Sequence, residues 1–130
     1  MAINLVCHNS TLLHPECWAS LSASYDVNHV YVSGGIASGM VDYDNPVPNL
    51  PGTIICVRFI EGPEIPASLD DFVHPEDAVY VFGPDDDISG WSSTFEGAMN
   101  IYIPTPSPTQ LYSHVAAGIV LNDRRLKAAE

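Results

Sequence analysis

Residues 78–127 read AVYVFGPDDDISGWSSTFEGAMNIYIPTPSPTQLYSHVAAGIVLNDRRLK, and this stretch decides the fold. It contains two short apolar runs, 78–82 and 100–103, and each run is stopped by glycine or proline. β-Branched and aromatic residues bounded by turn formers are typical of buried strands. A helix is expected from about Gln110 to Lys127. Because ligands of α/β folds bind in loops at the carboxyl ends of parallel strands, the glycine loop and the proline loop are the first places to look for a site.

The expected C-terminal helix has an apolar face and a basic end. Apolar or small residues recur along it at three- and four-residue spacing: Leu111, Val115, Gly118, Ile119 and the pair Leu121–Asn122. The cations Arg124, Arg125 and Lys127 lie in the last turn, where positive charge suits the helix dipole.

The first half of the chain predicts a βαβ unit. Residues 3–7 and 29–33 are expected strands, and the intervening segment 14–25 is an expected helix with its bulky residues on one face. A right-handed crossover makes the two strands parallel. With a further strand at 53–60, TIICVRFI, the sequence predicts an α/β fold with a mostly parallel sheet of about five to six strands.

Two segments between the expected strands show no clear periodicity. Residues 36–52 contain three prolines and are interpreted as a loop within one domain, or alternatively as a mobile lid. A helix-poor segment precedes the strand at 78–82. Inside the strand at 53–60, Arg58 is interpreted as a solvent-facing cation, with pairing to an acid at the sheet margin as the alternative.

Composition indicates one globular domain, 1–130, with 46% hydrophobic residues. No apolar run approaches the roughly 18 residues that span a bilayer, so no membrane partner and a cytoplasmic location are expected. Cys7, Cys17 and Cys56 are odd in number and scattered, which gives no disulfide framework. They are expected to be buried free thiols.

Charge bounds the choice of partner. Four Arg and Lys against sixteen Asp and Glu give a net charge of −12. Since phosphate contacts supply most nucleic-acid affinity, this surface should repel RNA except beside Arg124, Arg125 and Lys127. An enzyme for RNA with this charge would need a basic partner protein, or else a small substrate. The alternative is that the acidity serves solubility, because net charge governs association rather than fold.

Two motifs within residues 78–127 resemble those of a known family. VFGPDDDIS (81–89), followed about twenty residues later by IYIPTPSPTQLYSHVAAGIVL (101–121), resembles the second and third motifs of the SPOUT, or α/β-knot, RNA methyltransferases that methylate a ribose 2′-oxygen. The resemblance implies a single SPOUT-like domain with a C-terminal trefoil knot. It implies S-adenosylmethionine bound in a bent form, largely through main-chain groups. It also implies methyl transfer to tRNA or rRNA, and a homodimer with the C-terminal helix in the interface.

The resemblance also assigns site residues. The cofactor would be held at three corners of the chain, by Ile60, Glu61, Gly62, Phe82, Gly83, Pro84, Ile103, Pro104, Thr105 and Leu111. Gly83 would let the backbone approach a ligand closely. The candidates for proton transfer are His14 and His114, because imidazole is the side chain suited to act as a base near neutral pH, and Tyr112, whose ring offers a hydroxyl or a stacking surface. Simple packing is the alternative for Tyr112.

The chain departs from the family pattern where catalysis would need it. Aligned without gaps, Ser20 falls where the family has a catalytic arginine, Asp85 replaces a glutamate, and Tyr112 replaces an asparagine. Two alternatives therefore stay open: a degenerate domain that binds S-adenosylmethionine or a protein partner without catalysis, and an enzyme that acts on the cofactor itself or on a small molecule. The run 85–87 of three aspartates is interpreted as a solvated turn, because adjacent carboxylates point in different directions, and no metal site is expected.

Overall fold

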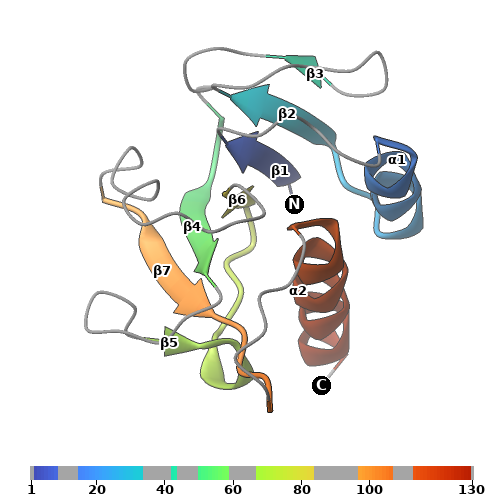
Figure 1. Cartoon of the computed structure of the whole chain (residues 1–130). Coiled ribbons are helices and arrows are strands. Elements are labelled where there is room, and N and C mark those ends of the chain that lie inside the picture. The colour runs from blue at the N-terminus through green and yellow to red at the C-terminus, as the bar shows by residue number, and fades with distance from the viewer. Residues whose placement is uncertain are drawn as a thin grey trace.

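The computed structural model describes residues 2–8, 15–33, 42–43, 50–58, 67–83, 97–106 and 113–129. These ranges form one parallel sheet with two α-helices packed against it (Figure 1). No helix within them is long and apolar enough to cross a membrane.

All strand pairs of the sheet are parallel, and the strand order is β3-β2-β1-β6-β4-β7-β5. In chain order the strands are β1 (Ile3–His8), β2 (His29–Ser33), β3 (Asp42–Tyr43), β4 (Thr53–Arg58), β5 (Ala67–Ser68), β6 (Ala78–Phe82) and β7 (Met99–Tyr102). The helices are α1 (Pro15–Ser24), the 3₁₀ helix η1 (Leu69–Asp71) and α2 (Ser113–Ala128).

The predicted parallel α/β sheet is confirmed, and the five longer strands and both α-helices lie within a few residues of their expected positions. Within the described ranges the sheet has seven strands, where about five to six are expected, because β3 and β5 add a short strand at each edge. β3 lies inside the expected loop 36–52 and pairs with β2, and β5 pairs with β7. Each is two residues long, which is too short for alternation to be visible in sequence.

The central strand β6 lies wholly inside the protein core. All five of its residues, AVYVF, are buried. A parallel sheet is covered on both faces, so its inner strands read as continuous apolar runs and do not alternate. Residues 78–82 show this pattern in the sequence.

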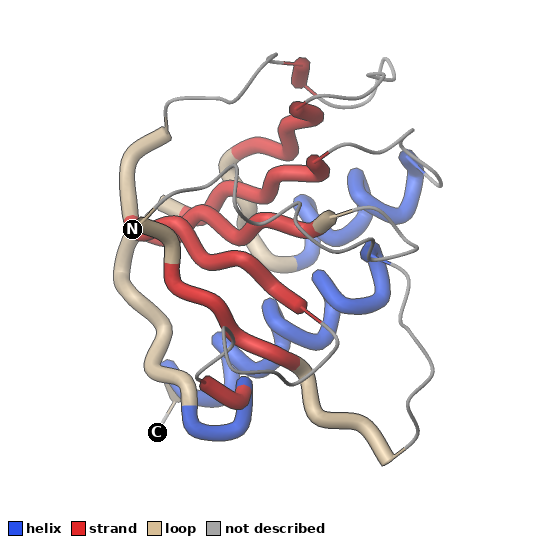
Figure 2. The backbone as a smooth tube through the Cα atoms, turned by 60° about the vertical axis from the view of Figure 1, so that its left-hand side comes forward, coloured by secondary structure: helices blue, strands red, loops and turns tan. Residues whose placement is uncertain are grey.

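Both α-helices lie on one face of the sheet (Figure 2). The larger core cluster joins this face to Trp18 of α1 and to Ala116, Ala117 and Val120 of α2. The smaller core cluster is formed by strand residues of the other parity, which point to the opposite face. Its buried members are Val6, Cys56, Val79 and Val81.

The buried face of α2 differs from the one that large apolar residues indicate. Val115 and Ile119 are 42% and 38% exposed, whereas Ala116 and Ala117 are fully buried. Small side chains let a helix approach its neighbour closely, so Ala116 and Ala117 contact the core together with Val120 and Leu121. Arg124, expected at a basic helix end, is also buried.

The cysteines are free thiols, as expected. Cys7 and Cys56 are buried, and Cys17 is half-buried. Burial raises the pKa of Cys56 to about 12, so its thiol keeps its proton at neutral pH.

Candidate functional site

Two of the predicted corners of the cofactor site start from the two strands that flank β4 in the sheet. β4 lies between β6 and β7, and all three run parallel, so their carboxyl ends lie side by side. Val57 lies opposite Phe82 on one side and opposite Ile101 on the other. The amide of Ile103 donates to the carbonyl of Arg58 at 3.2 Å, which continues the ladder beyond the end of β7. The glycine loop and the proline loop therefore begin at the same edge of the sheet.

The start of α2 is attached to the end of β6. The hydroxyl of Ser113 donates to the carbonyl of Gly83 at 2.8 Å, and Ser113 is buried. This contact places the amino terminus of α2, with the positive end of its dipole, beside the carboxyl ends of the strands. Polar or anionic groups of a ligand are favoured at such a place.

The residues of the two loops divide into buried and exposed. Phe82 and Ile103 are 0% and 4% exposed, and the Phe82 ring lies 5.9 Å from the ring of Trp18. These two side chains belong to the core, so what they can offer a ligand is main-chain groups. Pro104 and Thr105 are exposed. The division suits a site built largely from backbone, as the resemblance implies.

The structure describes part of the predicted site. His114 is half-buried in the first turn of α2, directly after the residue that contacts Gly83. It therefore lies at the same edge as the two loops. The other predicted residues lie outside the described ranges: Ile60, Glu61, Gly62, Pro84, Leu111, His14 and Tyr112. Their roles stay predictions.

Arg58 is a buried cation at this edge. It is 6% exposed, so its interpretation as a solvent-facing cation is wrong. It points to the same face of β4 as Cys56, and its positive charge opposes part of the rise that burial causes in the Cys56 pKa. A buried charge is costly without a partner, and Arg58 does not lack one. Burial therefore favours the alternative interpretation, a paired cation at the sheet margin.

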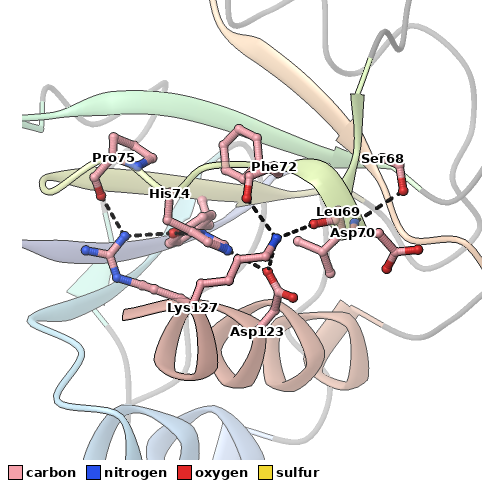
Figure 3. Close-up of polar contacts among 10 residues, drawn as sticks. Ser68, Leu69, Asp70, Phe72, His74, Pro75, Asp123 and Lys127 are labelled. Atoms are coloured by element: carbon pink, nitrogen blue, oxygen red, sulfur yellow. Dashed lines mark hydrogen bonds and ion pairs between the residues drawn. The ribbon is translucent and has the colours of Figure 1, made fainter. Parts of the chain in front are cut away.

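A second polar cluster lies toward the amino ends of the strands, where the segment that leads into β6 meets the last turns of α2 (Figures 2 and 3). His74 Nδ1 lies 2.7 Å from the hydroxyl of Tyr80, and His74 Nε2 lies 2.8 Å from Oδ2 of Asp123. Burial lowers the pKa of His74, while the hydrogen bond and the charge of Asp123 oppose that fall. Burial also raises the pKa of Tyr80, so the phenol keeps its proton.

Arg124 is held inside this cluster. Its Nη1 donates to the carbonyl of Pro75 at 2.7 Å and to the hydroxyl of Tyr80 at 3.0 Å. Its Nη2 donates to the carbonyl of Glu76 at 2.8 Å. The guanidinium thus satisfies buried and partly buried acceptors of the fold. The expectation that Arg124 offers its charge to RNA at the surface is wrong.

Lys127 is engaged in the same way (Figure 3). Its Nζ donates to the carbonyls of Leu69 and Phe72 at 2.6 and 2.7 Å, and lies 2.9 Å from Oδ2 of Asp123. Arg125, by contrast, is exposed and contacts Asn122 at 3.2 Å. Of the three cations near the end of α2, Arg125 is the one left on the surface.

A pocket of about 820 Å³ opens beside this cluster. It is lined by Ile3 of β1, the end of α1, residues 70–76 and the last turns of α2. The described residues that line it include none of the predicted cofactor-binding positions. The pocket and the predicted cofactor edge are therefore separate features of the fold.

Sequence reasoning missed the second cluster. Its members are distant in the chain and belong to no motif, so His74 and Asp123 carry no signal of their own. For Arg124 a signal exists, because it follows Ala116, Ala117 and Val120 at helical spacing and so falls on their buried face.

No protein-family model matches the chain, and no curated protein sequence does. Solved structures match it at low identity. A structure described as "Structural insights into the 2-OH methylation of C/U34 on tRNA" is 17% identical, with a TM-score of 0.71 over 99% of this chain and 92% of that chain. A putative RNA methyltransferase of the TrmH family from Porphyromonas gingivalis is 16% identical, with a TM-score of 0.69 over 97% of this chain and 60% of that chain.

A third match holds a cofactor. It is the SpoU methyltransferase AviRb from Streptomyces viridochromogenes in complex with AdoMet, 12% identical, with a TM-score of 0.73 over 99% of this chain and 62% of that chain. The chain thus spans most of the first structure and under two thirds of the other two. At such identities the likeness is one of architecture. The protein has the fold of the TrmH and SpoU RNA methyltransferases, as the resemblance of its motifs predicts.

Proposed function

We propose that the chain is an S-adenosylmethionine-dependent RNA methyltransferase-like protein, with its cofactor cleft at the carboxyl ends of β6, β4 and β7. The observation that supports this most is the attachment of the start of α2 to Gly83, through Ser113, beside the beginning of the proline loop. A neighbour of the same fold is in complex with AdoMet. The bound cofactor would supply a methyl group on a sulfonium.

The protein's own residues would bind the cofactor and position the reacting groups. Main-chain groups at Gly83 and at 103–105 would line the cleft, where a backbone without obstruction lets a ligand approach closely. Holding the reacting groups in line supplies much of the rate of such a transfer. His114 is the described candidate for accepting the proton of a substrate hydroxyl, because it is half-buried at this edge.

The substrate has to overcome the charge of the protein. The net charge is −12, and Arg124 and Lys127 are engaged with carbonyls of the fold. RNA would therefore bind beside the exposed Arg125 or through a basic partner protein. The same observation favours a second candidate function, in which the domain binds S-adenosylmethionine and acts on a small molecule or performs no catalysis. We also propose that the C-terminal part of the chain forms a trefoil knot and that the protein is cytoplasmic.

The exposed side of α2 supports a homodimer. Val115, Ile119 and Leu126 are 42%, 38% and 51% exposed. At 100° per residue they fall within about 40° of one another around the helix, so they form one apolar stripe. Sedimentation tests the pairing: Ile119→Glu should turn a dimer into a monomer, while Val73→Glu, at an 85% exposed apolar position away from the stripe, should not. A wild-type protein that is monomeric at micromolar concentration would exclude this interface.

Calorimetry with S-adenosylmethionine tests the function. Binding is expected for the wild-type protein, and Ser113→Ala should weaken it several-fold because the start of α2 loses its contact with Gly83. Ser24→Ala, at the exposed last residue of α1, is the matched control and should bind normally. No binding by the wild-type protein would exclude both enzyme interpretations.

Transfer of a labelled methyl group to total tRNA then separates RNA modification from the second candidate. Arg125→Gln should lower transfer if RNA is the substrate, because Arg125 is exposed near the end of α2. Binding of the cofactor without transfer to RNA would favour the second candidate.

A further inference from the structure

Three sets of contacts join the end of α2 to the segment 69–77, which leads into β6. Asp123 contacts His74, and Lys127 holds the carbonyls at 69 and 72 (Figure 3). Arg124 holds the carbonyls at 75 and 76. We call these contacts together the latch. The latch holds the wall of the 820 Å³ pocket against the helix, because residues 70–76 line that pocket.

Hydrogen bonding in the latch is consistent with one protonation state of His74. Arg124 donates to the oxygen of Tyr80, whose hydroxyl proton can then go to Nδ1 of the imidazole. Nε2–H donates to Asp123. A neutral imidazole thus has its donor and its acceptor satisfied, with every proton directed one way along the chain of contacts.

Protonation of His74 disrupts this arrangement of hydrogen bonds. Both ring nitrogens then donate, so Nδ1–H points at the oxygen of Tyr80, which already receives a donor from Arg124. The hydroxyl proton of Tyr80 loses its acceptor. Tyr80 is fully buried, so water cannot easily replace that acceptor.

The other charges around His74 do not cancel this effect. From α2, Asp123 favours the imidazolium, whereas Arg124 and Lys127 oppose it. From β6, Tyr80 faces it as a neutral phenol. Burial is the largest influence, and it lowers the pKa of His74. The carboxylates of its own segment are exposed: Asp70, Asp71, Glu76 and Asp77.

We propose that the latch is a pH-sensitive device, in which proton uptake by His74 loosens segment 69–77 from α2 and alters the pocket that the segment lines. The sign follows from linkage. A buried histidine with a lowered pKa binds its proton more weakly when latched than when released, so the latch is strongest above the ordinary histidine pKa of about 6.5 and weakens as the pH falls below it. One proton changes the equilibrium by at most about tenfold per pH unit. The proposal does not depend on the methyltransferase proposal.

NMR titration of the full-length wild-type protein between pH 8 and pH 5 tests it directly. The imidazole signals of His74 should titrate below the ordinary histidine pKa of about 6.5. The amide signals of Leu69 and Phe72 and the ammonium signal of Lys127 should shift with the same midpoint as His74. Titration of His74 without these shifts would overturn the proposal, and so would a His74 midpoint at or above the ordinary value of about 6.5.

Variants supply a second readout, the equilibrium constant for denaturant unfolding across the same pH range. His74→Gln cannot take up the proton, so its unfolding constant should rise less than that of the wild-type protein as the pH falls. His29→Gln is the matched control and should follow the wild-type curve. Parallel curves for the wild-type protein and His74→Gln would overturn the proposal. If His74→Gln does not fold, Asp123→Asn should move the NMR midpoint to lower pH, and an unchanged midpoint would count against it.

Discussion

Replacing Arg124 with methionine tests how much the buried guanidinium stabilises the fold. The change keeps an aliphatic chain but removes the donors to the carbonyls of Pro75 and Glu76 and to the hydroxyl of Tyr80. A buried acceptor that loses its partner costs about 1–3 kcal/mol. Water can reach Pro75 and Glu76, which are half-buried and exposed, so the low end applies there, whereas Tyr80 is fully buried. Summed over the three acceptors, the expected loss of unfolding free energy is about 4 kcal/mol. This is a large part of the roughly 5–15 kcal/mol that stabilises a typical domain.

Denaturant unfolding followed by circular dichroism measures this loss, from the midpoint at an unchanged slope. Arg125→Met is the matched control, because it makes the same chemical change at the next residue, where the side chain is exposed and contacts Asn122. It should change the unfolding free energy by no more than about 0.5 kcal/mol. Equal losses for the two variants would refute the assignment of Arg124 to the core.

Two further pairs of measurements test the fold. Gly52→Ala should lower the unfolding free energy by at least about 3 kcal/mol, because φ is +114° and a Cβ would lie 2.7 Å from the backbone of Asp77. Gly97→Ala should cost about 1 kcal/mol, because φ is +82° but the space around it is open. Similar losses for the two variants in calorimetric melts would contradict the close approach at Gly52. Cys17 should react with a thiol reagent at pH 8 before Cys56, whose pKa is raised to about 12 by burial, and mass spectrometry of early time points would show the reverse order if Cys56 were accessible.

The sheet was predictable because its strands are set by local composition. The run AVYVF at 78–82 is apolar throughout, and a strand that is covered on both faces requires that pattern. The βαβ unit at the start follows from the strand, helix and strand spacing together with the handedness of crossovers. The short strands β3 and β5 carry no such signal, because two residues owe their pairing to the neighbouring strand alone.

The packing of α2 was not predictable from its large apolar residues. Hydrophobicity alone places Val115 and Ile119 inside, yet Ala116 and Ala117 are buried with Val120 and Leu121, whereas Val115 and Ile119 stay exposed. The buried Arg124 is compatible with this face only because carbonyls of the segment before β6 receive its donors. Such partners come together through tertiary structure and cannot be read from the helix sequence.

The candidate site was predictable in kind but not in arrangement. Gly83 and the proline at 104 mark loops at strand ends, which local sequence shows. These loops begin close together at one edge of the sheet because only β4 lies between β6 and β7, and strand order cannot be read from local sequence. Before the strand order is known, only the family resemblance implies that the two loops converge.

The most direct test of the central claim is an NMR titration of the protein with S-adenosylmethionine. The account predicts that amide signals of Gly83, Ile103, Thr105 and the first turn of α2 shift in a saturable manner, while those of segment 69–77 at the other side stay in place. Shifts confined to segment 69–77, or none at all at millimolar cofactor, would contradict a cleft at the carboxyl ends of β6, β4 and β7.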